Sequence, residues 1–355
     1  MQKRKLTKKL FGTLAFFALA ILSFLAVTSQ SESFSLHGLW KSVQQMQPLP
    51  LVLAFLSTLF FVLFEGFAIR LIVRSYGYPC RIRKGSMYAA TDVYFSAITP
   101  SAIGGQPACA YFMMKDGIPG SICAVALLCC LMMYSFSIVV IGIIALLLCP
   151  EVWFTFRLPS QILIVVGAVV QVLLAVGFYL LLRHDSWLHK LGTACLKLLK
   201  KCHLIRHYEK KQEKLDASIL KYRGECQILI DRPVLLIKMF LLNFGQRLAL
   251  MLVTVFCFLG FTQRTQDVIQ VMGVQCMVTI GSNCVPIPGA MGVYDLLLLD
   301  GFSGVVPEEL AVNLEVVSRS ISFYSCLIIC GLIVLYAYIR LFYLEHKREQ
   351  SGITN

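Results

Sequence analysis

The sequence predicts an all-α, polytopic membrane protein, with a single membrane domain over residues 1–355. Two compositional observations predict this class: 58% of the residues are hydrophobic and only 14% are charged. A third is that apolar runs of about 20 residues, the length of a membrane-spanning helix, recur along the chain. An ordinary soluble globular domain is excluded by this composition.

Six apolar runs are long enough to cross a bilayer as helices. They lie at residues 10–27, 51–73, 120–148, 161–183, 234–259 and 314–343. The first run follows a basic N-terminus and is either a cleaved signal peptide or a retained span. We expect a retained span, because the run is long and residues 27–30 form a poor cleavage site.

Two further apolar segments, residues 86–113 and 265–299, are each broken by the same kind of phrase. The phrase is Pro-Ser-Ala-Ile-Gly at residues 100–104 and Pro-Gly-Ala-Met-Gly at residues 288–292. Such a break at membrane depth is tolerated only where the backbone is buried in protein or lines a cavity. We therefore expect two re-entrant broken hairpins; the alternative is that the phrases only kink ordinary spans, which gives eight crossings.

The basic residues test this topology. With six crossings and two hairpins, 26 of the 32 Lys and Arg residues fall on one side, together with both termini. We therefore expect an inner (cytoplasmic) cell membrane protein with both termini in the cytoplasm. The crossing at 51–73 then runs opposite to the crossing at 234–259, which predicts an inverted-topology internal repeat with units at about 51–148 and 234–343.

Residues 183–232 form a basic cytoplasmic insert between the two units. Two apolar stripes with helical spacing occur in it: Trp187, Leu191, Cys195, Leu198 and Leu199, and then Leu215, Ile219, Tyr222, Cys226 and Leu229. We expect an amphipathic helical hairpin on the inner leaflet with anionic lipid as partner, or else a solvated face without a specific partner. Nucleic acid is not expected as a partner, because the net charge of +13 follows largely from the basic cytoplasmic side.

Charged residues inside the spans are candidates for contact with a substrate, because a charge at the centre of a span costs about 2.5–3.5 kcal/mol. Arg247 lies deepest, with Asn243 on the same helical face and Gln246 next to it in sequence. Arginine is a multi-donor cation suited to phosphate, so these three residues are predicted to bind an anionic headgroup. In the alternative interpretation, Arg247 pairs with a buried acid and only locks two helices together.

Four other charged residues lie in or beside the apolar segments. Arg319 follows Glu315 by one helical turn, which suits either a local ion pair or a binding role. Asp92, in the first broken segment, would meet a headgroup ammonium, carry a coupling proton or cap a helix. Asp295, in the second, would act similarly or only interact with the N-terminus of a half-helix.

Glycines beside the two breaks form a separate set of candidates: Gly104, Gly105, Gly289 and Gly292. A half-helix that starts just after such a turn presents free N–H groups and a positive dipole end, which attract phosphate. The alternative is that these glycines only permit tight turns or close helix packing.

These residues and motifs resemble the integral-membrane domain of the lysylphosphatidylglycerol synthase/flippase family, over residues 10–345 or so. The resemblance rests on residues 99–107, residues 286–295, and Arg319 with Ser322 and Tyr324. It adds Gln106 to the predicted site. The chain differs from the family pattern at Ala290 and Asp295, in the second phrase, and at Cys109, where many members carry a basic residue.

The resemblance implies movement of a phospholipid between membrane leaflets, such as an aminoacylated phosphatidylglycerol or another lipid with an anionic headgroup. In two-part family members aminoacyl transfer belongs to a soluble C-terminal domain, and we expect this chain to lack that domain because it ends soon after its last span. A separately encoded lipid-modifying enzyme is compatible with this expectation, as is an oligomer.

The sequence contains no nucleotide-binding phosphate loop and no metal-ligand cluster, so we expect no cofactor and no direct use of ATP. Transport would be passive or driven by an ion or proton gradient. Two other functions stay open. One is an integral-membrane enzyme or accessory factor of lipid-linked aminoacyl or glycosyl transfer, with Asp92 and Glu65 as its acid/base pair. The other is a small-solute transporter.

Overall fold

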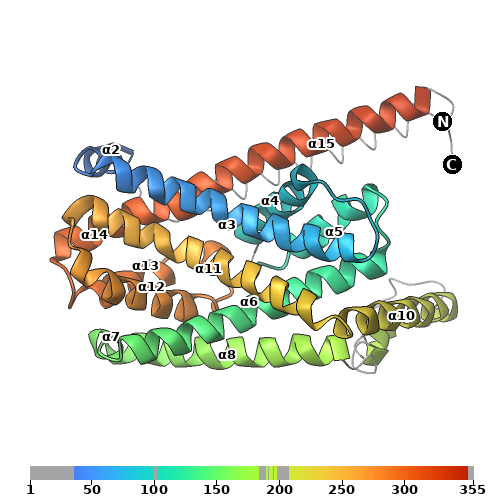
Figure 1. Ribbon diagram of the computed structural model, residues 1–355, viewed down its shortest axis with the longest axis horizontal. Helices are drawn as coiled ribbons and strands as arrows, with labels where there is room; N and C mark the ends of the chain where they lie inside the picture. The colour runs from blue at the N-terminus through green and yellow to red at the C-terminus, as the bar shows by residue number, and fades with distance from the viewer. Residues whose placement is uncertain are drawn as a thin grey trace.

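The computed structural model describes residues 36–99, 102–183, 189–190, 192–194, 196–197 and 208–350. The regular elements in these ranges are all helices, and the long ones lie roughly side by side (Figure 1). The expected crossing at 10–27 and the first amphipathic stripe, from Trp187 to Leu199, lie outside the described residues.

Five helical runs are long and apolar enough to cross a membrane, judged by length and composition. They are α3 (Pro48–Ser75), α6 (Gly120–Leu148), α8 (Leu158–Arg183), α11 (Pro233–Thr262), and a last run of α14 (Glu308–Arg319), the π-helical turn η4 (Ser320–Ser325) and α15 (Cys326–Gln350). They coincide with the five expected crossings within the described ranges. The last run begins at Glu308, six residues before the expected start, because α14 continues straight into η4 and α15. The prediction of an all-α polytopic membrane protein is confirmed.

Both broken segments form pairs of short helices. The first pair is α4 (Ile82–Ile98) with α5 (Gly105–Lys115), and the second is α12 (Val268–Ser282) with α13 (Val293–Phe302), preceded by the short 3₁₀ turn η3 (Pro288–Ala290). The two helices of each pair pack against each other, and η3 also contacts α4. Figure 1 shows α4 and α5 toward one end of the bundle and α12 and α13 toward the other. The chain is therefore broken at both phrases, as expected from their Pro and Gly residues.

Short elements close the two ends of the bundle. α2 (Leu36–Gln44), α7 (Val152–Thr155) and the 3₁₀ turn η2 (Thr265–Asp267) lie at one end, whereas α10 (Tyr208–Ile230) lies at the other (Figure 1).

The second apolar stripe of the insert lies on α10 and faces the protein. Ile219, Tyr222, Cys226 and Leu229 are buried, and α10 packs against α6, α8 and α11. The Tyr222 hydroxyl donates a hydrogen bond of 3.1 Å to the carbonyl oxygen of Leu181, at the end of α8. The expectation that this stripe rests on the inner leaflet is therefore wrong for these four residues, because the ends of three spanning helices cover it instead.

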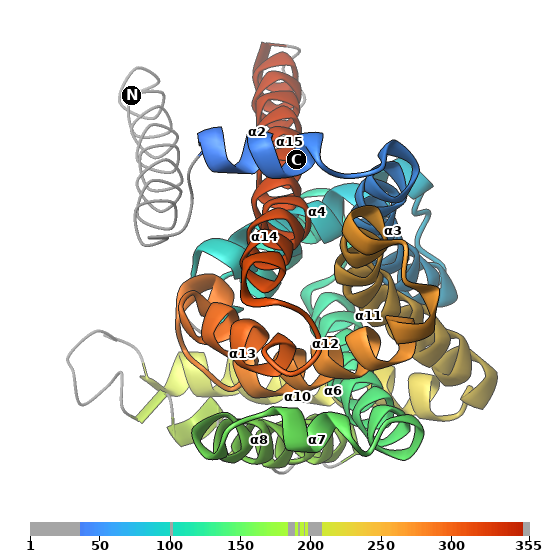
Figure 2. The same cartoon turned by 90° about the vertical axis from the view of Figure 1, so that its left-hand side faces the viewer.

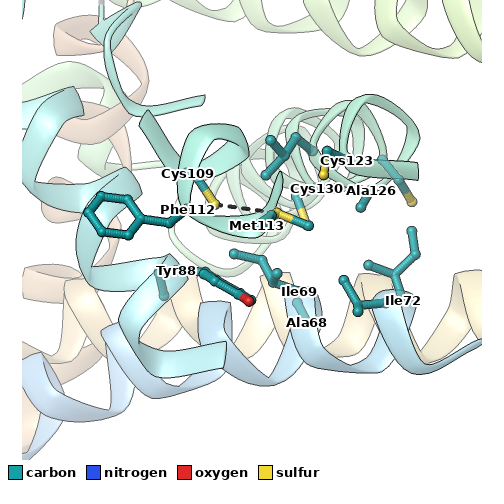
Figure 3. Close-up of a cluster of buried hydrophobic side chains, with 14 of the residues drawn as sticks. Ala68, Ile69, Ile72, Tyr88, Cys109, Phe112, Met113, Cys123, Ala126 and Cys130 are labelled. Carbon is teal, nitrogen blue, oxygen red and sulfur yellow. Dashed lines mark hydrogen bonds between the residues drawn. The ribbon is translucent and has the colours of Figure 1, made fainter. Parts of the chain in front are cut away.

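Two hydrophobic clusters hold the helix pairs in place. In the first, Ile69 and Ile72 of α3 pack with Tyr88 of α4, Met113 of α5 and Cys130 of α6, as the close-up in Figure 3 shows. The second joins α6, α11, α12, α13 and α14 through residues that include Met251, Phe258, Met277, Leu297 and Phe302. Each pair is thus anchored along its flanks by close packing.

An ion pair lies at the base of each helix pair, at the end away from the break. In the first pair, Lys84 Nζ lies 2.8 Å from Asp116 Oδ1, and the Tyr88 hydroxyl donates a hydrogen bond of 2.5 Å to Asp116 Oδ2. At the second pair, Arg157 Nε, from the segment between α7 and α8, lies 3.4 Å from Asp300 Oδ1 of α13.

Helix α8 packs closely on α12 through Gly167. A Cβ atom at this position would lie 2.1 Å from the backbone oxygen of Ile280, which cannot move aside without shifting α12. A Cβ atom at Gly177, ten residues further along α8, would meet nothing within 4 Å. Gly167 therefore sets the distance between α8 and α12.

We expect Gly167→Ala to destabilise the protein by about 1–3 kcal/mol, as overpacking does in other cores, and to lower the midpoint of thermal unfolding in detergent. Gly177→Ala is the matched control, because it makes the same change on the same helix in open space. Equal unfolding midpoints for the two variants would show that the α8–α12 contact is not as close as described.

Candidate functional site

A cavity of about 870 Å³ lies among the helices and is lined by side chains from both broken links and from several spanning helices. Its volume is in the range of sites that hold a small molecule or a lipid headgroup. Seven of the twelve predicted site residues line it: Asp92, Gln106, Asn243, Gln246, Arg247, Gly289 and Arg319. The structure thus brings together residues that are far apart in the sequence.

Arg247 projects from the middle of α11 between two aromatic rings. Its guanidinium carbon lies 4.9 Å from the ring centre of Phe61 on α3 and 4.4 Å from that of Tyr134 on α6. The side chain is only 7% exposed. In the described part of the chain, its Nε has no hydrogen-bond partner. Anion binding by Arg247 and a lock between helices through a buried acid both stay predictions.

The surroundings of Arg247 do not compensate its charge. Burying an unpaired ion costs several kcal/mol, whereas a cation–π contact contributes about 0.5–2 kcal/mol. The carboxyl groups of Glu65 and Asp92 also attract the guanidinium. Since a guanidinium offers several N–H donors in a planar array, this arrangement leaves Arg247 able to bind an anion such as a phosphate.

Glu65 and Asp92 line the cavity together with Arg247, and an amide side chain donates a hydrogen bond to one oxygen of each carboxyl group. Gln246 Nε2 donates a hydrogen bond of 2.8 Å to Glu65 Oε2, and Gln106 Nε2 donates one of 2.8 Å to Asp92 Oδ2. The Ser96 hydroxyl donates a longer one, of 3.4 Å, to Asp92 Oδ1. The two carboxyl groups also lie within hydrogen-bonding reach of each other. Asp92 caps neither α4 nor α5, so its predicted role as a helix cap is not seen.

Other polar groups of the cavity are also satisfied within the protein. Asn243 Nδ2 donates a hydrogen bond of 2.9 Å to the carbonyl oxygen of Met239, one turn earlier on α11. Gln275 Oε1 accepts hydrogen bonds of 3.0 Å from Thr254 and 3.2 Å from Tyr294. Asn243 and Gln275 therefore stabilise the wall of the cavity.

Gly104 and Gly105 bring α5 against α4 and do not line the cavity. A Cβ atom at Gly105 would lie 2.1 Å from Asp92 Oδ1. The Gly104 amide donates a hydrogen bond of 2.9 Å to Thr99 Oγ1 and is not free for an anion. These two glycines serve close packing, and that packing places Gln106 beside Asp92.

Arg319, at the end of α14, forms a second aromatic-flanked guanidinium. Its centre lies 4.5 Å from the ring centre of Tyr294 and 4.7 Å from that of Phe323. Unlike Arg247, it has partners: Nη2 donates to the carbonyl oxygen of Gly289, and Nε lies 3.7 Å from Asp295 Oδ1. Arg319 therefore ties the second helix pair to the last spanning run.

The acids near Arg319 differ from the predicted arrangement. The sequence suggested a local ion pair with Glu315, but the ion pair that forms is with Asp295, on a different helix. Glu315 is buried beside Asp295. Asp295 Oδ2 also accepts a hydrogen bond of 3.0 Å from the Gly292 amide, which stabilises the first turn of α13. Tertiary packing thus favours a partner from the neighbouring helix over one on the same helix.

Gly289 and Gly292 both adopt positive φ angles, of 61° and 74°, which favour glycine. A Cβ atom at Gly289 would also lie 2.5 Å from Phe323 Cζ. Gly292 does not line the cavity, and neither do Asp295 and Glu315.

The predicted site omitted several residues that line the cavity: Phe61, Glu65, Tyr134, Gln171, Gln275, Thr279, Tyr294 and Phe323. Glu65 and Gln171 carried a detectable signal, because each is an isolated polar residue within an apolar run, as Arg247 is. The aromatic residues carried no such sequence signal, since phenylalanine and tyrosine are common in any span.

Apolar helices that surround a cavity with buried charges define a polytopic membrane protein with an internal polar site. Within the described ranges, no group of three or more His, Cys, Asp or Glu residues is placed to hold a metal ion. The model of the lysylphosphatidylglycerol synthase TM region matches residues 9–330. The chain therefore belongs to this family, which handles membrane phospholipids. Neither the curated proteins nor the solved structures include a match to this chain.

We expect Asp295→Asn to loosen the α12–α13 link, because the substitution removes the charge that pairs with the nearly buried Arg319. Hydrogen exchange of backbone amides 283–292 should become about 10-fold faster, which corresponds to about 1.4 kcal/mol. Asp300→Asn is the control: it makes the same change on the same helix, where the partner Arg157 is 82% exposed and the pair contributes little. Unchanged exchange in Asp295→Asn would show that the Arg319 pair does not hold the link.

Proposed function

We propose that this protein moves a phospholipid, such as an aminoacylated phosphatidylglycerol or a lipid with an anionic headgroup, from one membrane leaflet to the other. The observation that carries this proposal is the buried guanidinium of Arg247, which lines the cavity and whose Nε has no hydrogen-bonding partner among the described residues. A headgroup phosphate would compensate its charge, and membership of a family that handles membrane phospholipids supports a lipid as its source.

The two helix pairs suit alternating access to the cavity. In the proposed topology they are re-entrant hairpins of an inverted repeat that open from opposite sides of the membrane. Their positions toward opposite ends of the bundle support this topology, as does the contact between η3 and α4 (Figure 2 shows the bundle from one end).

The orientation of the protein follows from the same topology. The end that carries α10 receives the basic C-terminal parts of α3 and α5, so we assign it to the cytoplasmic side of the inner membrane.

Apolar residues at the cavity favour a lipid over a small solute. Leu174, Ile103 and Ile287 all line the cavity, yet they are 40%, 70% and 38% exposed. The wall of the site therefore continues into an apolar outer surface. Acyl chains can remain in the hydrocarbon of the bilayer along such a surface while the headgroup occupies the polar interior, an arrangement that a water-soluble solute does not need.

The proposal is tested by leaflet exchange in proteoliposomes without ATP. Phosphatidylglycerol and an aminoacylated analogue, each with a fluorescent acyl chain, are reconstituted with the protein, and the outer leaflet is quenched chemically. Protein-dependent loss of the protected signal is the expected result. Absence of exchange for both lipids, with and without an imposed proton gradient, would contradict the proposal.

We expect Arg247→Met to reduce the exchange rate at least 10-fold, because the variant removes the cation that compensates the phosphate. The matched control is Lys238→Met, which removes a cation from an exposed position on the same helix and should exchange lipid at the wild-type rate. Arg247→Lys should recover only part of the activity, since an ammonium cannot bind two phosphate oxygens in the planar manner of a guanidinium. Equal rates for Arg247→Met and Lys238→Met would remove Arg247 from the site.

A second candidate function is an integral-membrane enzyme of lipid-linked group transfer, favoured by the contact between Glu65 and Asp92. Two neighbouring carboxyl groups can act as acid and base. Incubation of the purified protein with labelled lipid and candidate donors should then yield a modified lipid that Glu65→Gln no longer produces. Leaflet exchange without any modified lipid would favour the translocase.

A further inference from the structure

The side-chain atoms that lack a hydrogen-bonding partner converge on the cavity. In the described part of the chain, six buried side-chain nitrogen or oxygen atoms have no hydrogen-bonding partner. One belongs to Gln212 on α10, and two face each other in the ion pair of Arg319 with Asp295. The other three are Arg247 Nε, Gln106 Oε1 and Gln171 Oε1, and all three residues line the cavity. Since buried polar groups are normally satisfied, these three atoms indicate what a ligand has to supply.

The chemistry of these atoms is specific. The unpaired donor is a cationic guanidinium, whereas both unpaired acceptors are neutral amide oxygens. The negatively charged acceptors of the site, Glu65 and Asp92, already accept hydrogen bonds from Gln246 and Gln106. An ammonium group would be held best by carboxylates, but a hydroxyl is matched by a neutral amide oxygen.

The three unpaired groups come from three different helices. Gln171 lies in the middle of α8 and is only 2% exposed, although α8 is otherwise apolar and largely open to its surroundings. Gln106 is in the first turn of α5, and its amide nitrogen is fixed by Asp92, so its oxygen is oriented. Arg247 is on α11. A headgroup bound to all three would be held by its phosphate on one helix and by its hydroxyl groups on two others.

We propose that the cavity selects a phosphate-ester headgroup that carries hydroxyl groups, such as a glycerol phosphate or sugar phosphate, over one that carries an ammonium. This inference rests on the proposed function, in that it takes a lipid headgroup as the occupant of the cavity. It narrows that function: an unmodified polyol headgroup satisfies the free groups of the site better than an aminoacylated one.

The test compares two lipids of the same charge, one with headgroup hydroxyls and one without. Phosphatidylglycerol and phosphatidylmethanol carry the same single negative charge, but the methyl ester lacks headgroup hydroxyls. With identical fluorescent acyl chains in proteoliposomes, phosphatidylglycerol should exchange about 10-fold faster, the effect of satisfying a buried acceptor. Lysylphosphatidylglycerol should be slower than phosphatidylglycerol as well.

The variant Gln171→Met removes the amide oxygen while it keeps the length of the side chain. The ratio of the phosphatidylglycerol rate to the phosphatidylmethanol rate should fall from about 10 to about 1–2 in this variant. The control is Val172→Met, on the adjacent and exposed position of α8, in which the ratio should stay at the wild-type value. A Gln171→Met variant that slows both lipids by the same factor would assign Gln171 to structure and overturn the inference for this residue.

Failure of this inference is distinguishable from failure of the proposed function. Equal rates of the two lipids in the wild-type protein would overturn hydroxyl selection while translocation stands. If the wild-type protein exchanges no lipid, translocation fails, and selection is read from binding instead. In detergent, phosphatidylglycerol should then raise the unfolding temperature more than phosphatidylmethanol at the same concentration, and equal shifts would overturn the inference.

Discussion

The interaction on which the structure depends is the placement of one guanidinium, that of Arg247, between the rings of Phe61 and Tyr134. A charge inside an apolar bundle is costly unless the surroundings compensate it, and two aromatic faces compensate it only in part. Three spanning helices, α3, α6 and α11, meet at this point. Their packing positions a cation that still has donors to offer, and the rest of the cavity is arranged around it.

Arg247 and Arg319 have similar surroundings but differ in the contacts that their guanidinium groups make. Each guanidinium lies between two aromatic rings, with an acid of a broken segment nearby: Asp92 near Arg247, and Asp295 near Arg319. Arg319 is bound to Asp295 and to the Gly289 carbonyl oxygen, whereas Arg247 is bound to neither of its neighbouring acids. A π-helical turn follows Arg319 directly, and such turns are frequent at functional sites. Arg319 holds the second helix pair to the last spanning run, whereas Arg247 is available to a ligand.

Much of the fold and part of the site could be predicted from the sequence, for identifiable reasons. Long apolar runs reveal spanning helices, so the crossings at α3, α6, α8, α11 and the last run were found with small errors at their ends. Arg247 and Arg319 stand out because charge is rare in such runs. The contact of Arg319 with Asp295 was not among the alternatives drawn from the sequence, because sequence spacing reveals neighbours on the same helix and not neighbours on another helix. The burial of the α10 stripe was missed for the same reason, since an apolar stripe does not specify whether lipid or protein covers it.

By itself, the sequence determined that the chain is helical, lies in a membrane, and breaks at two Pro/Gly phrases, because hydropathy and backbone chemistry are local properties of the chain. Only the tertiary structure decided which polar groups are satisfied and which are not. Gln246 and Gln106 donate hydrogen bonds to Glu65 and Asp92, while Arg247 Nε and Gln171 Oε1 have no hydrogen-bonding partner in the described part of the chain. Whether a polar group is hydrogen-bonded depends on side chains from helices that are far apart in the sequence. The order of residues along the chain does not specify which of these side chains come into contact.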